Sequence, residues 1–452
     1  MIRIELKESN NRPYSHSLMY GMLEKKFKKI RVFMLKNIPK ILLSISVGIL
    51  VCIPMEKAAA VETPELDSLV AQVSALSKYI ERNFISHENT VLSADELRLI
   101  VKEGTDWLIN AQEDDGRFAY EYVPYEDMYL DDDHVVRQSG SLYELGEIAR
   151  RDSAGVMNVS DAIKNSVGYL ESLTEEVEYN DNTFRCITDS EKSSRCQLGA
   201  TSLALLGILG YVEGGQKKSS QYESLIEEYL NYIMAMKKRD EGFKGYYITN
   251  RSSQSDKESS FSNGEALLAL VRYYQYNPRE DVKTMIDDTF TYLEGKEFET
   301  PLYLWIMAAL KDMQELWPDE RYVTYAQEFT NTRRGSLTRL HYTQKNYCAT
   351  TEGLASAYNV LKGNVSESEL SLLRQEIDFW NVHNSVLQIL PVDKYRFVFE
   401  GSAFVMQMLQ DVEQAQGGFL TSTSVLTQRI DYTQHCVSAY LQTLVDIEGN
   451  EL

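Results

Sequence analysis

The sequence predicts an all-α protein whose helical hairpins form an α/α toroid, a closed barrel of six to seven hairpins. One observation is a layout that occurs three times: a helix-like stretch, a glycine turn followed by phenylalanine, a polar loop and an apolar helix. The turns are Gly116-Arg117-Phe118, Gly242-Phe243 and Gly418-Phe419. A second observation is that helices with one polar face alternate with helices that are apolar all round. Repeated hairpins of this kind indicate a repeat architecture.

Six segments have the pattern of an outer layer. Apolar residues recur at i, i+3 and i+4 with charged residues between them, which is typical of a helix with one face in water. Three segments begin with a serine that is followed three residues later by glutamate, the capping box that satisfies free backbone N–H groups. The predicted outer helices are 93–112, 160–173, 220–238, 279–293, 319–329 and 366–380.

Seven further segments have the pattern of an inner layer. Segment 197–212 is the clearest, because glycine and alanine stand among its leucines and almost no residue is polar. A helix that is apolar on every side is surrounded by protein. The predicted inner helices are 138–150, 197–212, 263–276, 301–316, 347–362, 400–412 and 432–447.

The last inner helix, 432–447, needs a partner, and we expect residues 65–83 to supply it and to close the ring. An open α-solenoid is the alternative, since it also stacks helix pairs. Closure is favoured because the pairs are irregular in length and the loops at one end are much longer than those at the other. We find no sustained alternation that would predict a sheet domain.

The N-terminal segment 1–60 is predicted to be a signal peptide, which leaves residues 61–452 as the toroid domain. An apolar stretch, 41–54, follows Lys36 and Lys40, and the small residues Ala58-Ala59-Ala60 follow it. This order of basic, apolar and small residues is typical of an export signal. Met34 is an alternative start. We therefore expect a periplasmic or secreted protein whose membrane contact is at most transient and made through this segment.

The charge of the chain argues against a nucleic-acid partner. The net charge is −21, and segment 1–60 holds 11 basic and 4 acidic residues, so the remainder has 46 − 11 = 35 basic and 67 − 4 = 63 acidic residues, a net charge of −28. Phosphate binding needs a basic stripe. The expected partner is a glycan or a small-molecule substrate, and the sequence predicts no oligomeric state.

Four cysteines follow the export segment. Cys186 and Cys196 lie in one loop, where a local disulfide is expected in an exported protein, whereas Cys348 and Cys436 can pair only if their helices are neighbours. A zinc site made of Cys196, Cys348, His435 and Cys436 is an alternative, but no C-x-x-C or H-x-x-x-H spacing supports it. We predict neither a metal nor a cofactor.

The loop 121–137 is the densest group of candidate site residues. Paired carboxylates and a histidine suit acid–base or glycosyl chemistry, and tyrosine rings stack on sugars. An acidic loop that caps a helix N-terminus is the structural alternative. The candidates are Asp133 and His134 for catalysis, and Tyr122, Tyr129, Arg137 and Gln138 for substrate binding.

The second group surrounds the start of the last inner helix. Asp431 and His435 are four residues apart and share one helical face, so we predict that they form a proton-transfer pair. Arg429 and Tyr432 beside them are candidates for substrate binding. The structural alternative is an N-cap aspartate with a packed histidine.

Two glutamates stand in otherwise apolar inner helices. They are Glu265, a candidate catalytic residue, and Glu352, a candidate for substrate binding. A buried carboxylate is costly unless it is paired or used. We expect the loop ends after Phe118, Phe243 and Phe419 to gather at one mouth of the ring, so that these side chains line one cup.

Trp107-Leu108, Gln112 and Asp115-Gly116-Arg117-Phe118 resemble the repeats of terpenoid-cyclase and prenyltransferase toroids, and the turns of (α/α)6-barrel carbohydrate-active enzymes. The resemblance covers the three turns and the helix rhythm, and it implies the fold. Asp131-Asp132-Asp133 lacks the D-x-D-D spacing of terpenoid cyclases. The C-H-G motif of the similar lanthionine cyclases is absent, since His435-Cys436 has the reverse order.

The resemblance to carbohydrate-active barrels implies an exported enzyme that acts on a glycan or uronate-containing polysaccharide. Hydrolase, lyase and epimerase reactions all remain open, and each would use carboxylate and histidine acid–base chemistry. The alternative is a non-catalytic toroid that binds a glycan, a peptide or an envelope component. An enzyme requires at least two such groups within reach of one substrate atom, whereas a binder requires only an aromatic platform.

Overall fold

The computed structural model describes residues 91–179, 182–190, 193–215, 219–239, 242–255, 258–336, 345–390, 395–400, 403–423 and 425–452. The expected export segment, 1–60, and the expected closing helix, 65–83, lie outside these residues. Within the described ranges, no helix combines the length and the apolar character needed to cross a membrane.

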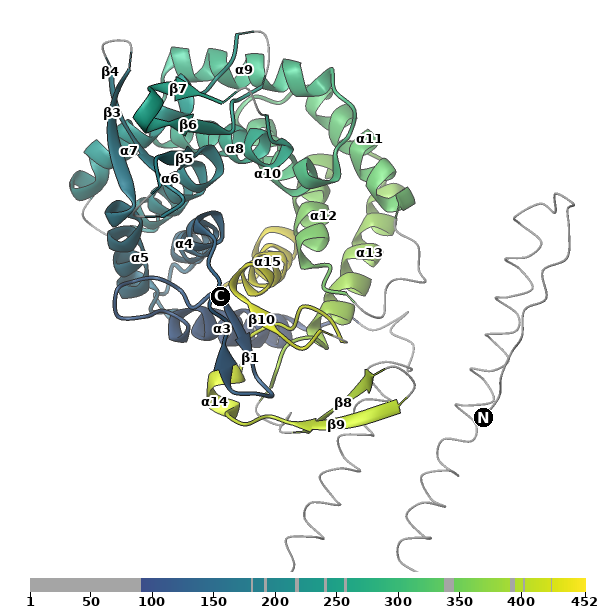
Figure 1. Cartoon of the computed structure of the whole chain (residues 1–452). Coiled ribbons are helices and arrows are strands. Elements are labelled where there is room, and N and C mark those ends of the chain that lie inside the picture. The colour runs from purple at the N-terminus through teal and green to yellow at the C-terminus, as the bar shows by residue number, and fades with distance from the viewer. Residues whose placement is uncertain are drawn as a thin grey trace, which may run out of the picture. The chain divides into compact units, whose positions relative to one another are not determined.

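The described chain contains an inner ring of six helices (Figure 1). Each packs on the next, and the last packs on the first, so the ring closes. Closure confirms the predicted α/α toroid and contradicts the open solenoid. The inner helices are α4 (Val135–Arg151), α6 (Leu198–Glu213), α8 (Ser260–Tyr276), α10 (Tyr303–Leu316), α12 (Cys348–Leu361) and α15 (Ile430–Leu441), which continues as the π-helical turn η5 (Gln442–Ile447).

An outer layer of six helices surrounds this ring in the described chain. The outer helices pack on the inner helices beside them, and α3 packs on α15. Ser93 and Ser366 cap α3 and α13 as predicted, by accepting the backbone N–H of Glu96 and Glu369. The outer helices are α3 (Ala94–Asn110), α5 (Ser160–Ser172), α7 (Ser219–Ala235), α9 (Glu280–Glu294), α11 (Glu320–Ser336) and α13 (Glu367–Ser385).

The predicted inner helix 400–412 is wrong. This segment belongs to the antiparallel hairpin of β8 (Tyr395–Glu400) and β9 (Ala403–Met408), which is followed by the short helix α14 (Val412–Ala415). Aromatic and β-branched residues on either side of Gly401-Ser402 favour a hairpin over a helix. Because α3 is the outer partner of α15, the described chain forms six hairpins without a seventh inner helix.

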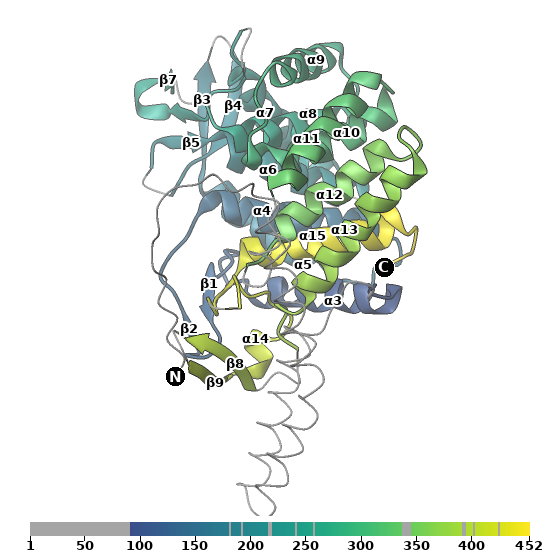
Figure 2. The ribbon, with the colours of Figure 1, turned by 90° about the vertical axis from the view of Figure 1, so that its right-hand side faces the viewer.

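The long connections, each leading from an outer helix to the next inner helix, lie at one end of the barrel, which we call the mouth (Figure 2). The first and last of them are joined by a sheet in which β1 (Glu121–Val123) pairs with both β2 (Met128–Tyr129) and β10 (Gln428–Arg429). A second sheet joins β5 (Arg195–Gln197), β6 (Tyr246–Ile248) and β7 (Ser253–Gln254), and a hairpin joins β3 (Thr174–Tyr179) and β4 (Asn182–Ile187). The predicted gathering of the loops at one mouth is confirmed.

The three glycine–phenylalanine turns attach these loops to the inner helices in the same way. The backbone N–H of Phe118, Phe243 and Phe419 each donates to a polar side chain in the first turns of the next inner helix. The acceptors are Gln138 Oε1 at 2.8 Å, Asn263 Oδ1 at 2.7 Å and Thr433 Oγ1 at 3.1 Å. The repeat seen in the sequence is therefore a docking device that sets where each inner helix begins.

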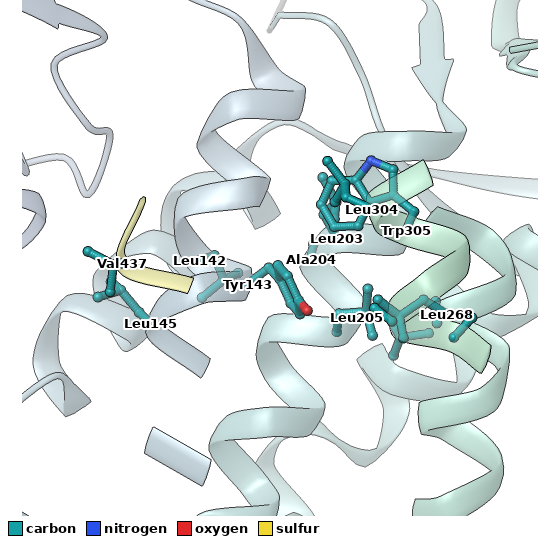
Figure 3. Packing of buried hydrophobic residues seen from close by; sticks show 14 of the residues in the cluster. Leu142, Tyr143, Leu145, Leu203, Ala204, Leu205, Leu268, Leu304, Trp305 and Val437 are labelled. Atoms are coloured by element: carbon teal, nitrogen blue, oxygen red, sulfur yellow. The ribbon is translucent and has the colours of Figure 1, made fainter. Parts of the chain in front are cut away.

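The wall of the barrel is an apolar core. Leu142 and Tyr143 of α4, Leu205 of α6, and Leu268 of α8 are fully or almost fully buried and lie close together in Figure 3. Gly146 and Gly207 let α4 and α6 approach closely, since a Cβ on Gly207 would sit 2.7 Å from Leu142. This close packing fixes the spacing of the inner helices, and thus of the groups at their ends.

A network of buried ion pairs fills the opposite end of the ring, which we call the base, where the inner helices end. Arg272 pairs with Asp312 and with Glu147, Arg151 pairs with Glu147 and Asp446, and Lys311 pairs with Asp446. Burial opposes the charged forms, yet the neighbouring arginines hold the pKa of Glu147 well below its usual range. In the same way, Arg151 and Lys311 depress the pKa of Asp446 against the effect of burial. At the base, buried positive and negative charges therefore balance one another.

Candidate active site

The mouth brings together side chains from the first six residues of five inner helices. An N-terminal helix end carries partial positive charge, so this end of the ring favours anionic groups. Contacts between these helices link the side chains. They are Arg137 (α4), Glu265 (α8), Trp305 (α10), Glu352 (α12), and Asp431 and His435 (α15).

His435 is paired with Glu352 across the α12–α15 boundary. Its Nδ1 lies 2.8 Å from Glu352 Oε2, and the hydroxyl of Ser438 donates to Glu352 Oε1 at 2.9 Å. Both partners are almost fully buried. In the neutral imidazole, a proton on Nδ1 that the carboxylate accepts leaves Nε2 with its lone pair, which is the arrangement of a histidine that can act as a base.

The predicted Asp431–His435 pair does not form. Asp431 is held by Arg429, whose Nε and Nη2 donate to its two oxygens at 3.0 and 2.6 Å, and by Arg137, whose Nε lies 3.4 Å from Oδ2. The Arg429 guanidinium also lies over the rings of Tyr120 and Tyr432. Ion pairing with two arginines is stronger than a contact with a neutral imidazole, so Asp431 turns toward them.

Arg137 lies at the mouth, and its guanidinium has N–H groups that make no described hydrogen bond. About a third of its side chain is exposed, and the guanidinium has one ion pair in the described structure, with Asp431. Its Nε is buried without a hydrogen bond in the described structure. A guanidinium in this state is suited to bind a carboxylate or an oxyanion of a ligand.

Glu265 is a buried carboxyl group without a hydrogen bond or an ion pair in the described part of the chain. Only 3 % of the residue is exposed, and its Oε2 lies so close to Gly199 of α6 that a Cβ at that glycine would clash with it. Burial raises the pKa of Glu265 to about 7, and the nearby charge of Arg137 opposes that rise. Glu265 is therefore poised to give or take a proton near neutral pH.

Trp305 completes the contact path between Glu265 and His435. Its ring centroid lies 6.0 Å from that of His435 and 5.9 Å from that of Tyr143. On its other side, Trp305 packs against Gly264, the neighbour of Glu265. Trp305 was not predicted from the sequence, although an aromatic side chain near the start of a predicted inner helix was the available signal.

Glu144 is a second buried carboxyl group, half-way along α4. It is fully buried, and neither oxygen has a hydrogen bond in the described structure. Burial raises its pKa well above the usual range, and the charges of Glu352 and Glu147 raise it further. Burial thus favours the neutral form of Glu144, in which it adds no negative charge beside the Glu352–His435 pair.

Gln138 and Tyr122, two predicted substrate-binding residues, are buried, and their polar groups form hydrogen bonds within the protein. The Gln138 amide bonds both backbone groups of Phe118 at 2.8 Å and also donates to Asp133 at 2.7 Å. The Tyr122 hydroxyl donates to Asp127 at 2.8 Å. Burial raises the pKa of the Tyr122 hydroxyl far above its usual range. Both residues hold the mouth loops together.

Asp133, His134 and Tyr129 lie on the exposed side of the mouth. Asp133 accepts the backbone N–H of His134 at 2.7 Å, and the hydroxyl of Tyr169 donates to it at 3.3 Å, so it holds the turn that precedes α4. Burial and Arg137 lower the pKa of His134. Tyr129 packs on Tyr122, with ring centroids 4.8 Å apart, and contacts Gln414. None of the three has a described hydrogen bond to the buried group around His435.

All four cysteines of the described chain are in disulfides, Cys186–Cys196 and Cys348–Cys436. The expected local bridge is confirmed, and the second bridge shows that the helices of Cys348 and Cys436 are neighbours. Disulfide sulfur is not available as a thiolate, so the alternative of a zinc site built from these cysteines is wrong.

No known protein family matches the chain, and no curated protein is similar to it in sequence. Solved structures share its fold. A D-mannose isomerase matches with a TM-score of 0.55 and 11 % identity over 78 % of this chain and 97 % of the other. The cellobiose 2-epimerase of Bacillus thermoamylovorans matches with a TM-score of 0.55 and 11 % identity over 77 % and 98 %.

A GH76 α-mannanase of Bacteroides thetaiotaomicron matches with a TM-score of 0.54 and 9 % identity over 78 % of this chain and 96 % of the other. At this level of identity the comparison establishes the architecture. The resemblance of the turns to those of (α/α)6-barrel carbohydrate-active enzymes is thus confirmed as a likeness of fold.

Proposed function

We propose that the protein is an exported enzyme that acts on a glycan or a uronate-containing polysaccharide by proton transfer at the mouth of the barrel. The observation that carries the proposal is the His435–Glu352 pair in the same ring of contacts as Glu265 and Arg137. A base, an acid that titrates near neutral pH and a partly exposed guanidinium are three groups that suit proton abstraction next to a carbonyl.

Each group has a distinct role in this proposal. Nε2 of His435 removes the proton from the carbon next to a sugar carbonyl or carboxylate, and Glu352 stabilises the imidazolium that results. The electron pair moves to the carbonyl oxygen, which takes a proton from Glu265, while Arg137 binds the charge that develops there. Return of a proton to the opposite face of the same carbon gives an epimer. Return of a proton to the former carbonyl carbon gives an isomer. Loss of a leaving group from the adjacent carbon gives an unsaturated product.

The similar structures support this class of reaction, since a D-mannose isomerase and a cellobiose 2-epimerase are among them. Export rests on the basic, apolar and small residues of segment 1–60. The disulfides support it as well, because such bonds persist in oxidising compartments.

Glycoside hydrolysis is the second candidate. It is favoured by the contrast between Glu265, whose pKa burial raises to about 7, and Asp431, which pairs with two arginines. One protonated and one ionised carboxyl group are the usual pair of a glycosidase. GH76 α-mannanases are also among the similar structures.

The experiment incubates the purified protein in heavy water with a panel of aldoses, disaccharides, mannans and uronate polymers, followed by proton NMR. Proton transfer predicts loss of one carbon-bound proton signal, together with a new epimer, isomer or unsaturated product. Hydrolysis predicts new reducing ends without that exchange. The variants His435→Gln and Glu265→Gln serve as inactive controls, and the exposed Glu113→Gln as an active one. Stabilisation by a glycan without any product would instead support the non-catalytic binding toroid.

A further inference from the structure

One of the two disulfides lies directly at the His435–Glu352 pair. Cys348 is the first residue of α12, and Glu352 follows it by four positions, so the two share one helical face. Cys436 follows His435 on α15. Both cysteines are fully buried. The covalent bond therefore joins the two helices within one turn of each member of the pair.

The pair depends on helices that are far apart in the chain. The two cysteines are separated by 88 positions, a span that includes the outer helix α13 and the β8–β9 hairpin. A charge-assisted hydrogen bond weakens when its partners move apart by a few tenths of an ångström. A slide of α12 along α15 would therefore break the contact between Nδ1 and Oε2.

Apart from the hydrogen bonds that Glu352 itself makes with His435 and Ser438, the printed polar links between α12 and α15 in the described structure are hydrogen bonds of neutral groups. The Ser356 hydroxyl donates to Gln442 at 2.8 Å deeper in the ring, and Asn346 lies 3.3 Å from the Cys436 sulfur just before α12. Each such bond contributes little net free energy, because water competes for its partners. The disulfide is the one covalent restraint on this boundary.

We propose that the Cys348–Cys436 disulfide is the positioning element that holds Glu352 in register with His435. The inference rests on the proposed function insofar as His435 is the base. The register keeps the proton on Nδ1 and leaves Nε2 free. Loss of the disulfide lets α12 and α15 shift, and His435 then exchanges between its two tautomers.

The Cys186–Cys196 disulfide provides a matched control. It joins β4 to β5 over ten positions of the chain, and neither strand carries a residue of the His435 group. Both sulfurs are as deeply buried as those of the other pair. Removal of either disulfide deletes one restraint on the chain, but only the Cys348–Cys436 disulfide borders His435.

The test compares Cys348→Ser/Cys436→Ser with Cys186→Ser/Cys196→Ser by nitrogen-15 NMR of the histidine rings in the folded chain. The His435 signals are assigned among six histidines by their loss in His435→Gln. We expect the wild type and the Cys186/Cys196 variant to show one Nδ1–H tautomer with a strongly hydrogen-bonded proton. The Cys348/Cys436 variant should show averaged tautomers, and kcat should fall at least tenfold with little change in KM.

If the serine variant does not fold, Cys348→Ala/Cys436→Val preserves the apolar contacts and is measured in its place. An unchanged His435 tautomer in a folded variant without the Cys348–Cys436 bond overturns the proposal. So does an equal change in the Cys186/Cys196 variant. Because the NMR readout needs no substrate, absence of glycan turnover rejects the proposed function while the positioning result stands or falls by itself.

Discussion

The two ends of the inner ring treat buried charge in opposite ways. At the base, Arg272, Arg151 and Lys311 each have a carboxylate partner, as expected where helix C-termini favour cations. At the mouth, Glu265 has no partner in the described structure, and Arg137 has one long contact. The described ion pairs satisfy these charges at the base, whereas Glu265 and part of the Arg137 guanidinium at the mouth remain open to a ligand. Unsatisfied buried groups persist in proteins mainly where function uses them.

The largest expected effect is on activity at the mouth. His435→Gln should lower kcat/KM by about 10²- to 10⁴-fold, because the proton-accepting imidazole is lost while a polar group still faces Glu352. The midpoint of thermal unfolding should change little. The measurement is turnover of the glycan found in the panel experiment, together with a melting curve. A variant that loses its fold along with its activity would make His435 a structural residue.

The ion-pair network at the base of the ring should show the reverse: a large loss of stability and little loss of activity. Arg272→Met leaves Asp312 and Glu147 with less positive charge in a buried site, and it should lower the free energy of unfolding by about 3–5 kcal/mol. The kcat of the folded enzyme should stay near that of the wild type. Urea unfolding measures the loss. Arg137→Met at the mouth is the matched comparison, and it should change stability by less than about 1 kcal/mol because its ion pair is partly exposed. Equal losses for the two arginines would erase the distinction between base and mouth.

The sequence predicted the ring better than the contacts across it. Helices such as α6 are apolar all round, and this local pattern is readable without a structure. The pairing of His435 with Glu352 joins residues 83 positions apart, whereas the rejected partner Asp431 is only four positions away. Periodicity reveals which residues share one helix face, but not which face of another helix they meet. The β8–β9 hairpin was missed for a related reason, since a short apolar run does not by itself distinguish strand from helix.

Glu265 yields a prediction on pH. Its pKa is about 7 in the folded protein, whereas the reference value is 4.5. As pH rises, the unfolded chain therefore releases this proton at a lower pH than the folded protein does. Below pH 4.5 both states hold the proton. Stability then declines as pH rises from 4.5 to 7, and the full penalty, about 3 kcal/mol, is present above that range.

Glu265→Gln removes this penalty. The variant should be more stable than the wild type by up to about 3 kcal/mol at pH 8, equally stable at pH 4, and much less active. Urea unfolding at the two pH values measures the difference. Glu144→Gln is the control, since Glu144 is also buried with a raised pKa but has no role in the proposed proton transfer. A Glu265→Gln variant that is destabilised at pH 8 would show that the carboxylate has a partner in the folded protein.

The smallest effect tests whether the mouth also contains purely structural parts. Thr433 lies between Asp431 and His435 in the sequence, yet its hydroxyl accepts the backbone N–H of Phe419 at 3.1 Å and so holds the third glycine–phenylalanine turn. Thr433→Val keeps the shape and leaves that buried N–H unpaired, which should lower stability by about 1–2 kcal/mol. Thr433→Ser retains the acceptor and should stay close to the wild type. Both variants should keep kcat within a few-fold, because the turn sets where α15 begins and takes no part in proton transfer. If Thr433→Val lost activity as His435→Gln does, the docking turn would belong to the reacting group, and the mouth could not be divided into a scaffold and a site.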